Sequence, residues 1–244
     1  MEAIRALGEQ TFASLKIRNY RLYFIGIGFS HVGTWMQTVA LGWLVLELTG
    51  SGTLLGAMLA FRFAPLLFGG IFGGMIVDRF DKRLLLYATQ SASAVLALVL
   101  SALVFFGAME MWMVYLIALL FGFADVVDRP ARATFIHEMV GPDNLRNAVA
   151  LNSTEANIAR TFGPLFAGVL IASVGITFCF LANALSFVAV IIFLALMRES
   201  ELHRDLSEER KVDTVLSGLH YVASVPLIRT ILLSMAVIGI LSYE

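Results

Sequence analysis

The chain has 244 residues, of which 59% are hydrophobic and 14% are charged, and its formal net charge at pH 7 is −1. Soluble domains carry about 25% charged residues, so this composition excludes an ordinary soluble protein and indicates a membrane protein whose main partner is the lipid bilayer. The net charge says nothing about other partners, and we expect no nucleic acid. The single Cys179 excludes an intrachain disulfide and a metal site built from cysteines.

Apolar runs of membrane-spanning length recur along the chain. A hydrocarbon core of about 30 Å requires roughly 20 apolar helical residues. Runs of this length cover residues 22–46, 53–77, 84–106, 112–135, 148–174 and 177–197. A seventh run, residues 228–244, offers only about 15 apolar residues, which indicates a truncated span. We therefore expect an all-α membrane protein, with a six-helix bundle over residues 22–197 and the start of a seventh transmembrane helix.

Two polar segments flank this bundle. Residues 1–21 lack the apolar core of a signal peptide, so we expect a cytoplasmic segment and a first span that acts as the membrane signal. In residues 198–227, apolar side chains recur at helical spacing. These side chains are Val212, Val215, Leu216, Leu219 and Val222. We interpret the segment as a cytoplasmic linker with an amphipathic helix on the membrane surface; an ordinary solvated linker helix is the alternative.

Lysines and arginines are concentrated in every second connection. They precede the first span, separate the second from the third, flank the connection between the fourth and the fifth, and follow the sixth. The connections at residues 47–52, 107–111 and 173–176 contain no lysine or arginine. By the positive-inside rule, the N-terminus is cytoplasmic.

Charged residues also fall inside the predicted spans, where each costs about 2.5–3.5 kcal/mol at a helix centre. The charged residues of the fourth and fifth spans, together with Arg132 at the cytoplasmic side, form a candidate network. Its members are Asp125, Asp128, Arg129, Arg132, Glu155 and Arg160. Its first four members recur at helical spacing, so they form a stripe that can line a cavity; a static clamp of buried ion pairs is the alternative. Glu155 is expected to pair with another helix.

Two further polar features lie at depth. Arg62 has no acid on its own helix and lies about 13 Å from the outer end of its span, so we expect it to line a cavity and contact an electron-rich substrate group. The first span carries a stripe that we expect at a water-filled cavity, although hydrogen bonds between helices are the alternative. This stripe consists of Ser30, His31, Thr34, Gln37 and Thr38. Within it, His31 is a candidate carrier of a coupling proton or an ordinary packing residue.

The second and fifth predicted spans share a faint pattern. The second contains Arg62, Pro65 and Gly69, and the fifth contains Arg160, Pro164 and Gly168. Because the two spans cross the membrane in opposite directions, the pattern favours an inverted repeat of three plus three helices, with chance as the alternative.

The densest charge cluster separates the second and third spans. Residues 74–83, GMIVDRFDKR, resemble the signature loop Gly-x-x-x-Asp-Arg-x-Gly-Arg-Lys/Arg of the major facilitator superfamily of secondary transporters, with Asp81 in place of a glycine. Residues 35–41, 48–51, 128–132, 160–164 with Gly168, 219–222 and 226–229 resemble its branch of enterobactin exporters and macrolide-efflux-like proteins. The pair Gly163 and Pro164 matches the antiporter motif of the superfamily only in part.

The resemblance implies two six-helix bundles that rock around a central cavity, with this chain as the first bundle. In the family, the acid Asp78 meets the second bundle at the cytoplasmic gate, and the loop cations reach an acid on the fourth helix, here Asp128 or Asp125. The residues that it implicates in gating are Gly74, Asp78, Arg79, Asp81, Lys82 and Arg83.

We therefore expect half of an exporter in the bacterial plasma membrane, which moves a small organic molecule such as a siderophore or a drug and is driven by protons. Its partner is the missing C-terminal six-helix half or a second copy of the chain. The alternative is a non-transporting membrane module or subunit whose intramembrane charges are structural. We expect no enzyme activity, no cofactor and no metal, because the sequence has neither a nucleophile with a base nor a phosphate-binding loop.

Overall fold

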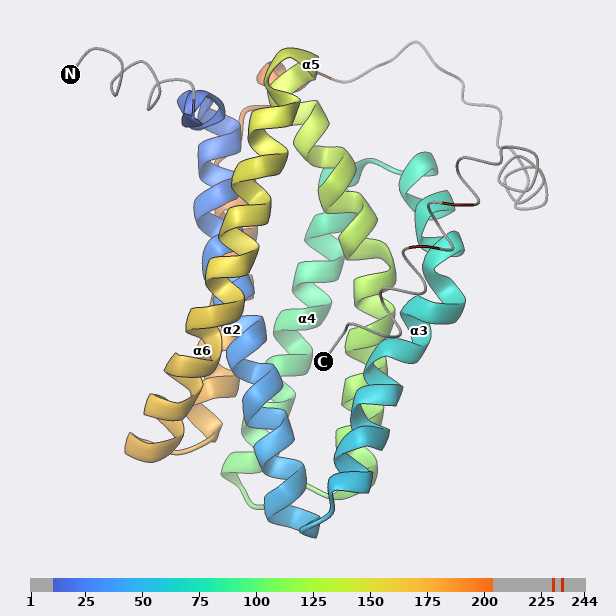
Figure 1. Cartoon of the computed structure of the whole chain (residues 1–244), viewed down its shortest axis with the longest axis vertical. Coiled ribbons are helices and arrows are strands. Elements are labelled where there is room, and N and C mark those ends of the chain that lie inside the picture. Colours follow the sequence, from blue (N-terminus) through green and yellow to red (C-terminus); the bar gives the residue numbers. More distant parts are fainter. Residues whose placement is uncertain (1–10, 204–229, 231–233, 235–244) are drawn as a thin grey trace. The chain divides into compact units, whose positions relative to one another are not determined.

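The computed structural model describes residues 11–203 together with Thr230 and Ser234, and this part of the chain contains helices and no strand (Figure 1). A short 3-10 helix, η1 (Ala13–Lys16), precedes the first long helix, and a second one, η2 (Glu199–Glu201), follows the last. The long helices are α2 (Arg18–Thr49), α3 (Gly52–Arg79), α4 (Lys82–Phe105), α5 (Met111–Ser173) and α6 (Thr177–Ala195). The expected all-α fold is confirmed.

The helices have the lengths and the surface that a bilayer requires. Helices α3, α4, α5 and α6 are long and apolar enough to cross a membrane. Helix α2 is not in this set, because Ser30, His31 and Gln37 interrupt its apolar run. Large apolar side chains such as Leu67 and Phe68 are exposed on α3, where lipid or another apolar surface must cover them. The chain is a multi-pass membrane protein.

Helix α5 contains both the fourth and the fifth predicted spans. It is interrupted at Gly141, whose φ of 68° lies in the left-handed region that favours glycine. Pro142 follows, and proline suits the first turn of a helix because it lacks the N–H that would have no partner there. We call residues 111–140 α5a and residues 142–173 α5b; Figure 1 shows them meeting at one end of the bundle. One glycine therefore replaces the longer connection that the sequence suggested.

Close approaches between helices occur at glycines. At Gly73 of α3 a Cβ atom would collide with the backbone oxygen of Val126 in α5a, and at Gly122 of α5a it would meet Arg62 and Pro65 of α3. Helix α5b approaches α2 in the same way, with Gly163 against Trp35. The second span thus packs on the fourth and the fifth packs on the first.

In an inverted repeat of three plus three helices, the second helix of each repeat packs on the first helix of the other, and these two contacts fit that arrangement. The repeat itself stays a prediction. The glycines of the repeated pattern are not equivalent: Gly69 faces Val126, whereas Gly168 faces open space.

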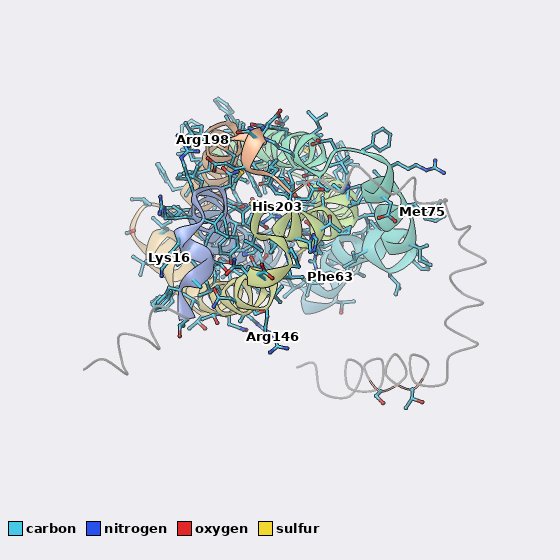
Figure 2. The ribbon with its side chains drawn as sticks, turned by 90° about the horizontal axis from the view of Figure 1, so that it is seen from above. Lys16, Phe63, Met75, Arg146, Arg198 and His203 are labelled. Carbon is cyan, nitrogen blue, oxygen red and sulfur yellow. The ribbon has the colours of Figure 1, made fainter. Side chains whose placement is uncertain are left out.

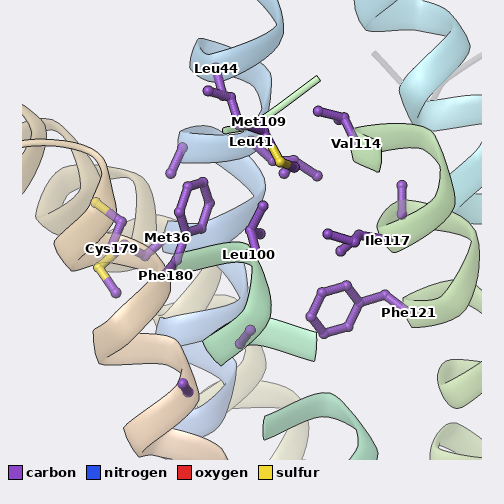
Figure 3. Packing of buried hydrophobic residues seen from close by; sticks show 14 of the residues in the cluster. Met36, Leu41, Leu44, Leu100, Met109, Val114, Ile117, Phe121, Cys179 and Phe180 are labelled. Atoms are coloured by element: carbon purple, nitrogen blue, oxygen red, sulfur yellow. The ribbon is translucent and has the colours of Figure 1, made fainter. Parts of the chain in front are cut away.

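The apolar core is divided into two clusters. One contains Met36, Leu44, Phe121 and Phe180 (Figure 3), and the other contains residues at the opposite ends of the same helices. This second cluster includes Tyr20, Ile27, Ala131, Phe135 and Leu194. Along α2, His31 falls between the two clusters, and along α5a so do Asp125 and Asp128. The intramembrane charges therefore lie between two apolar layers.

Polar contacts join the first turn of α2 to the start of α5b and to the residues that follow α6. Figure 2 views this end of the bundle from above, with Lys16, Arg198 and His203 labelled. Asn19 of α2 exchanges two hydrogen bonds with the backbone of Arg198, at 2.8 and 3.0 Å. The Tyr20 hydroxyl donates to the carbonyl of Ala148 in α5b at 2.8 Å. These bonds fix α2, α5b and the end of α6 to one another.

Of residues 205–244, the structure describes Thr230 and Ser234, and both are helical. The predicted amphipathic helix at residues 212–222 lies outside the described residues, as do most of the predicted seventh span and residues 1–10.

Candidate functional site

A cavity of about 330 Å³ lies among α2, α3, α4, α5 and α6, between the two apolar layers. Aromatic side chains, including Trp35, Phe63 and Phe121, form part of its wall. Its polar and charged lining consists of His31, Thr34, Gln37, Thr38, Arg62, Gln90, Ser93, Asp125, Asp128, Arg129, Arg132 and Asn183. Of the predicted cavity residues, Ser30 is absent from this lining: it is fully buried.

A second hollow, of about 960 Å³, lies at the C-terminal ends of α2 and α5b. Its lining is mostly apolar, with Trp43, Leu48 and Ile171, and Glu47 is its one charged residue. Pro164 and Gly168 of the predicted helix-five motif lie here rather than at the polar cavity. We place the candidate site at the smaller cavity, because it gathers the intramembrane charges.

Asp125 holds two guanidinium groups in the cavity wall. Its Oδ2 atom lies 2.9 Å from Nη2 of Arg62 and 3.2 Å from Nη2 of Arg129. Arg62 lines the cavity, and its acidic partner comes from α5a, where the close packing of α3 brings it. Arg62 also lies over the ring of Phe121, at 5.5 Å.

Asp128 is enclosed by donors. Thr89 Oγ1 and Gln90 Nε2 of α4 each donate to its Oδ1 atom at 2.7 Å, and Arg132 pairs with its Oδ2 atom. Three donors from two helices therefore converge on one carboxylate. The sequence reasoning missed Thr89 and Gln90, although a glutamine in the middle of an apolar span was the available signal.

His31 links α5b to α5a. Its Nδ1 atom lies 2.8 Å from Oε2 of Glu155, and its Nε2 atom lies 3.3 Å from Nη1 of Arg132. Because arginine only donates, Nε2 accepts, and we assign the proton of neutral His31 to Nδ1, which donates to Glu155. Glu155 pairs with another helix, as expected. A continuous polar chain thus runs from Glu155 through His31 and Arg132 to Asp128.

Arg160 contacts an aromatic ring of the cavity wall. It is exposed on α5b, and its guanidinium lies 5.5 Å from the ring of Trp35, which lines the cavity. A cation above an indole ring is a favourable arrangement. The charges that we grouped from the sequence therefore fall into separate sets: the Asp125 pair, the Asp128 to Glu155 chain, and Arg160 on Trp35.

The signature loop contacts other groups than those expected. Lys82 lies 3.5 Å from Glu138, and Arg83 pairs with Glu199 at 2.7 Å, whereas we expected Asp128 or Asp125 to receive the loop cations. The reason is depth: Glu138 is ten residues further along α5a than Asp128, about 15 Å at 1.5 Å per residue. Arg83 also donates to the carbonyl of Leu194 at 2.6 Å, which ties α4 to the end of α6.

The remaining loop residues mark the ends of helices. Asp81 caps α4, since its Oδ1 atom accepts from the backbone N–H of Leu84 at 3.0 Å, and this role accounts for an acid where the superfamily pattern has glycine. Arg79 lies in the last turn of α3, directly after Asp78. A cation there complements the helix dipole. Gly74 faces open space, unlike Gly73.

Apolar membrane-crossing helices surround a cavity walled by intramembrane ion pairs, an arrangement that is typical of membrane transporters. The family model described as transmembrane secretion effector, a family of the major facilitator superfamily, matches residues 9–243, and the chain belongs to this family.

Two curated transporters are similar to the chain. It is 31% identical over 177 residues to the staphyloferrin A transporter of Staphylococcus aureus, covering 71% of this chain and 45% of that protein. It is 26% identical over 214 residues to the uncharacterized MFS-type transporter YfiS of Bacillus subtilis, covering 86% of this chain and 50% of that protein. The chain thus spans about half the length of the curated relatives it matches.

Proposed function

We propose that this chain is the N-terminal half of a secondary active transporter that exports a small organic molecule, such as a siderophore or a drug, by proton-coupled alternating access. The observation that carries the proposal is the polar chain from Glu155 to Asp128 in the wall of a membrane cavity. The similarity to a protein named for staphyloferrin A transport supports a siderophore among the candidate substrates.

The coupling proton is carried by Glu155 and His31. Asp128 has three donors, so protonating it would disrupt a complete set of contacts, whereas Glu155 has one contact to His31. A proton added to Nε2 of His31 would place two donors face to face, because Arg132 also donates there. Protonation of the pair would therefore release Arg132 from α2 and leave it with Asp128. Protonation is thereby coupled to the contact between α2 and α5a.

The signature loop acts at the cytoplasmic gate, with Asp78 facing the second bundle. The chain matches only 45% and 50% of the two relatives, which supports a C-terminal six-helix half as the partner; a second copy is the other arrangement. The protein lies in the bacterial plasma membrane with its N-terminus in the cytoplasm, since lysine and arginine are confined to one set of connections.

The test is export from proteoliposomes that contain the full-length protein, with an imposed pH gradient and two labelled probes, anionic 4-hydroxybenzoate and the cationic dye ethidium. We expect Glu155→Gln to retain equilibrium binding of the transported probe but to lose pH-driven movement. Glu110→Gln, in the connection before α5, is the matched control and should behave like the unmodified protein. Unchanged pH dependence in Glu155→Gln would remove Glu155 from the coupling step.

The structural alternative has its own supporting observation. Asp128 is fully engaged by Arg132, Thr89 and Gln90, as a static clamp would be. A non-transporting module would move neither probe under any gradient, and its charge variants would change only the amount of folded protein.

A further inference from the structure

The pair of guanidinium groups at Asp125 carries more positive charge than its one carboxylate neutralises. The charged residues that line the cavity are the cations Arg62, Arg129 and Arg132 and the acids Asp125 and Asp128. Arg132 is matched by Asp128, so Asp125 alone faces two cations. His31 is neutral in the tautomer assigned above, and the carboxylate of Glu155 lies behind it, outside the cavity lining. One positive charge is left at Arg62 and Arg129.

Among the described residues, these two arginines also use little of their hydrogen-bonding capacity. Each guanidinium carries five donors in a planar fork. Both arginines direct Nη2 at the same oxygen, Oδ2 of Asp125, and within the described residues Nη1 of Arg62 is buried without a hydrogen-bond partner. The side chain of Arg129 is 54% exposed and that of Arg62 is 17% exposed, so Arg129 is the more accessible cation.

The surroundings suit an organic anion rather than an inorganic one. Phe63 and Phe121 line the same cavity, and Arg62 lies over the ring of Phe121. Binding sites for organic molecules typically combine such apolar walls with a few placed polar groups. A carboxylate fits an arginine fork in a bidentate manner, and an aromatic or aliphatic body fits the walls.

We propose that Arg62 and Arg129 bind a carboxylate group of the substrate, and that this carboxylate displaces Asp125 from the two guanidinium groups. Asp125 is then an internal competitor: it keeps two intramembrane cations paired and yields them to the substrate. This deepens the proposed transport function and rests on it, because it assigns the transported molecules to the class of organic carboxylates.

The experiment is equilibrium binding to the full-length protein in lipid nanodiscs, with 4-hydroxybenzoate and the uncharged 4-hydroxybenzamide as probes. These probes have nearly the same shape and differ in charge. We expect the carboxylate to bind at least about tenfold more tightly than the amide, since charge-assisted hydrogen bonds contribute about 1.5–3 kcal/mol. Equal affinity for the two probes, or binding of neither, would overturn the carboxylate site.

Variants test the residues. Arg129→Gln should abolish the preference for the carboxylate, and Arg146→Gln, which removes an exposed cation outside the cavity, should leave it unchanged. Arg62→Lys keeps the charge and loses the fork, so it should lower the preference severalfold. A preference that survives in Arg129→Gln, or is lost equally in Arg146→Gln, would contradict the assignment.

The displacement step has a separate outcome. Asp125→Asn removes the competing charge and should tighten binding of 4-hydroxybenzoate, while weaker binding would show that Asp125 only positions the arginines and would overturn that step. Failure of the transport proposal would appear elsewhere, as absence of gradient-driven movement of 4-hydroxybenzoate and ethidium in proteoliposomes.

Discussion

Asp128 and Glu155 lie in the two segments of one helix, and each exposes 7% of its surface, yet their surroundings differ. Asp128 receives Arg132, Thr89 and Gln90. Glu155 has His31 at one oxygen, and within the described residues its Oε1 atom is buried without a hydrogen-bond partner. Equal burial therefore does not mean equal surroundings: three donors contact the first carboxylate, and His31 alone contacts the second within the described residues.

The largest expected difference between the two acids is in stability. Asp128→Asn would leave the charge of Arg132 buried without its counter-charge, and breaking a buried pair in this way costs about 3–5 kcal/mol. Glu155→Gln leaves a neutral histidine beside a neutral amide and should cost about 1 kcal/mol or less. Membrane abundance and thermal unfolding of the full-length variants measure the difference. Equal losses would mean that both acids are structural.

A second comparison separates titration from hydrogen bonding at His31. In His31→Gln, the amide oxygen can accept from Arg132 and the amide nitrogen can donate to Glu155, but the side chain does not titrate. We therefore expect folded protein in nearly normal amounts and a transport rate that varies little with pH between about 5 and 8, the range in which histidine changes charge. The variant is measured in proteoliposomes at several pH values.

The control for this variant is His137→Gln, which replaces a histidine of α5a outside the cavity lining and should keep the normal pH profile. A normal profile in His31→Gln would return His31 to a packing role and leave Glu155 as the proton carrier by itself.

The sequence predicted where the helices lie, but not which residues on different helices pair. Apolar runs located α3 and α4 to within two residues at each end, because a span must satisfy its own backbone and its length is set by the bilayer. The pairing of Arg62 with Asp125 depends instead on which faces of α3 and α5a meet. That choice is made by the close approach at Gly73 and Gly122, which spacing along one helix does not encode.

The neutral partners of Asp128 were missed for a related reason. Thr89 and Gln90 lie on α4, a different helix from Asp128. Neutral polar residues cost little free energy in an apolar span, so their presence there does not by itself indicate a site. The depth of the signature loop relative to α5a was misjudged as well, since the sequence does not say how far two helices are shifted along each other. Lys82 therefore meets Glu138 and not Asp128.

The smallest expected effect tests whether each donor at Asp128 contributes to the difference from Glu155. Thr89→Val has nearly the same shape as threonine and removes one donor from the carboxylate, so it should lower the free energy of unfolding by about 1 kcal/mol. Thr134→Val is the matched control, because the Thr134 hydroxyl donates to carbonyls of its own helix, at 3.0 Å from Pro130 and 3.1 Å from Ala131. Thermal unfolding of both full-length variants gives the comparison. A loss at Thr89 no greater than that at Thr134 would mean that Arg132 and Gln90 suffice to hold the Asp128 carboxylate in place.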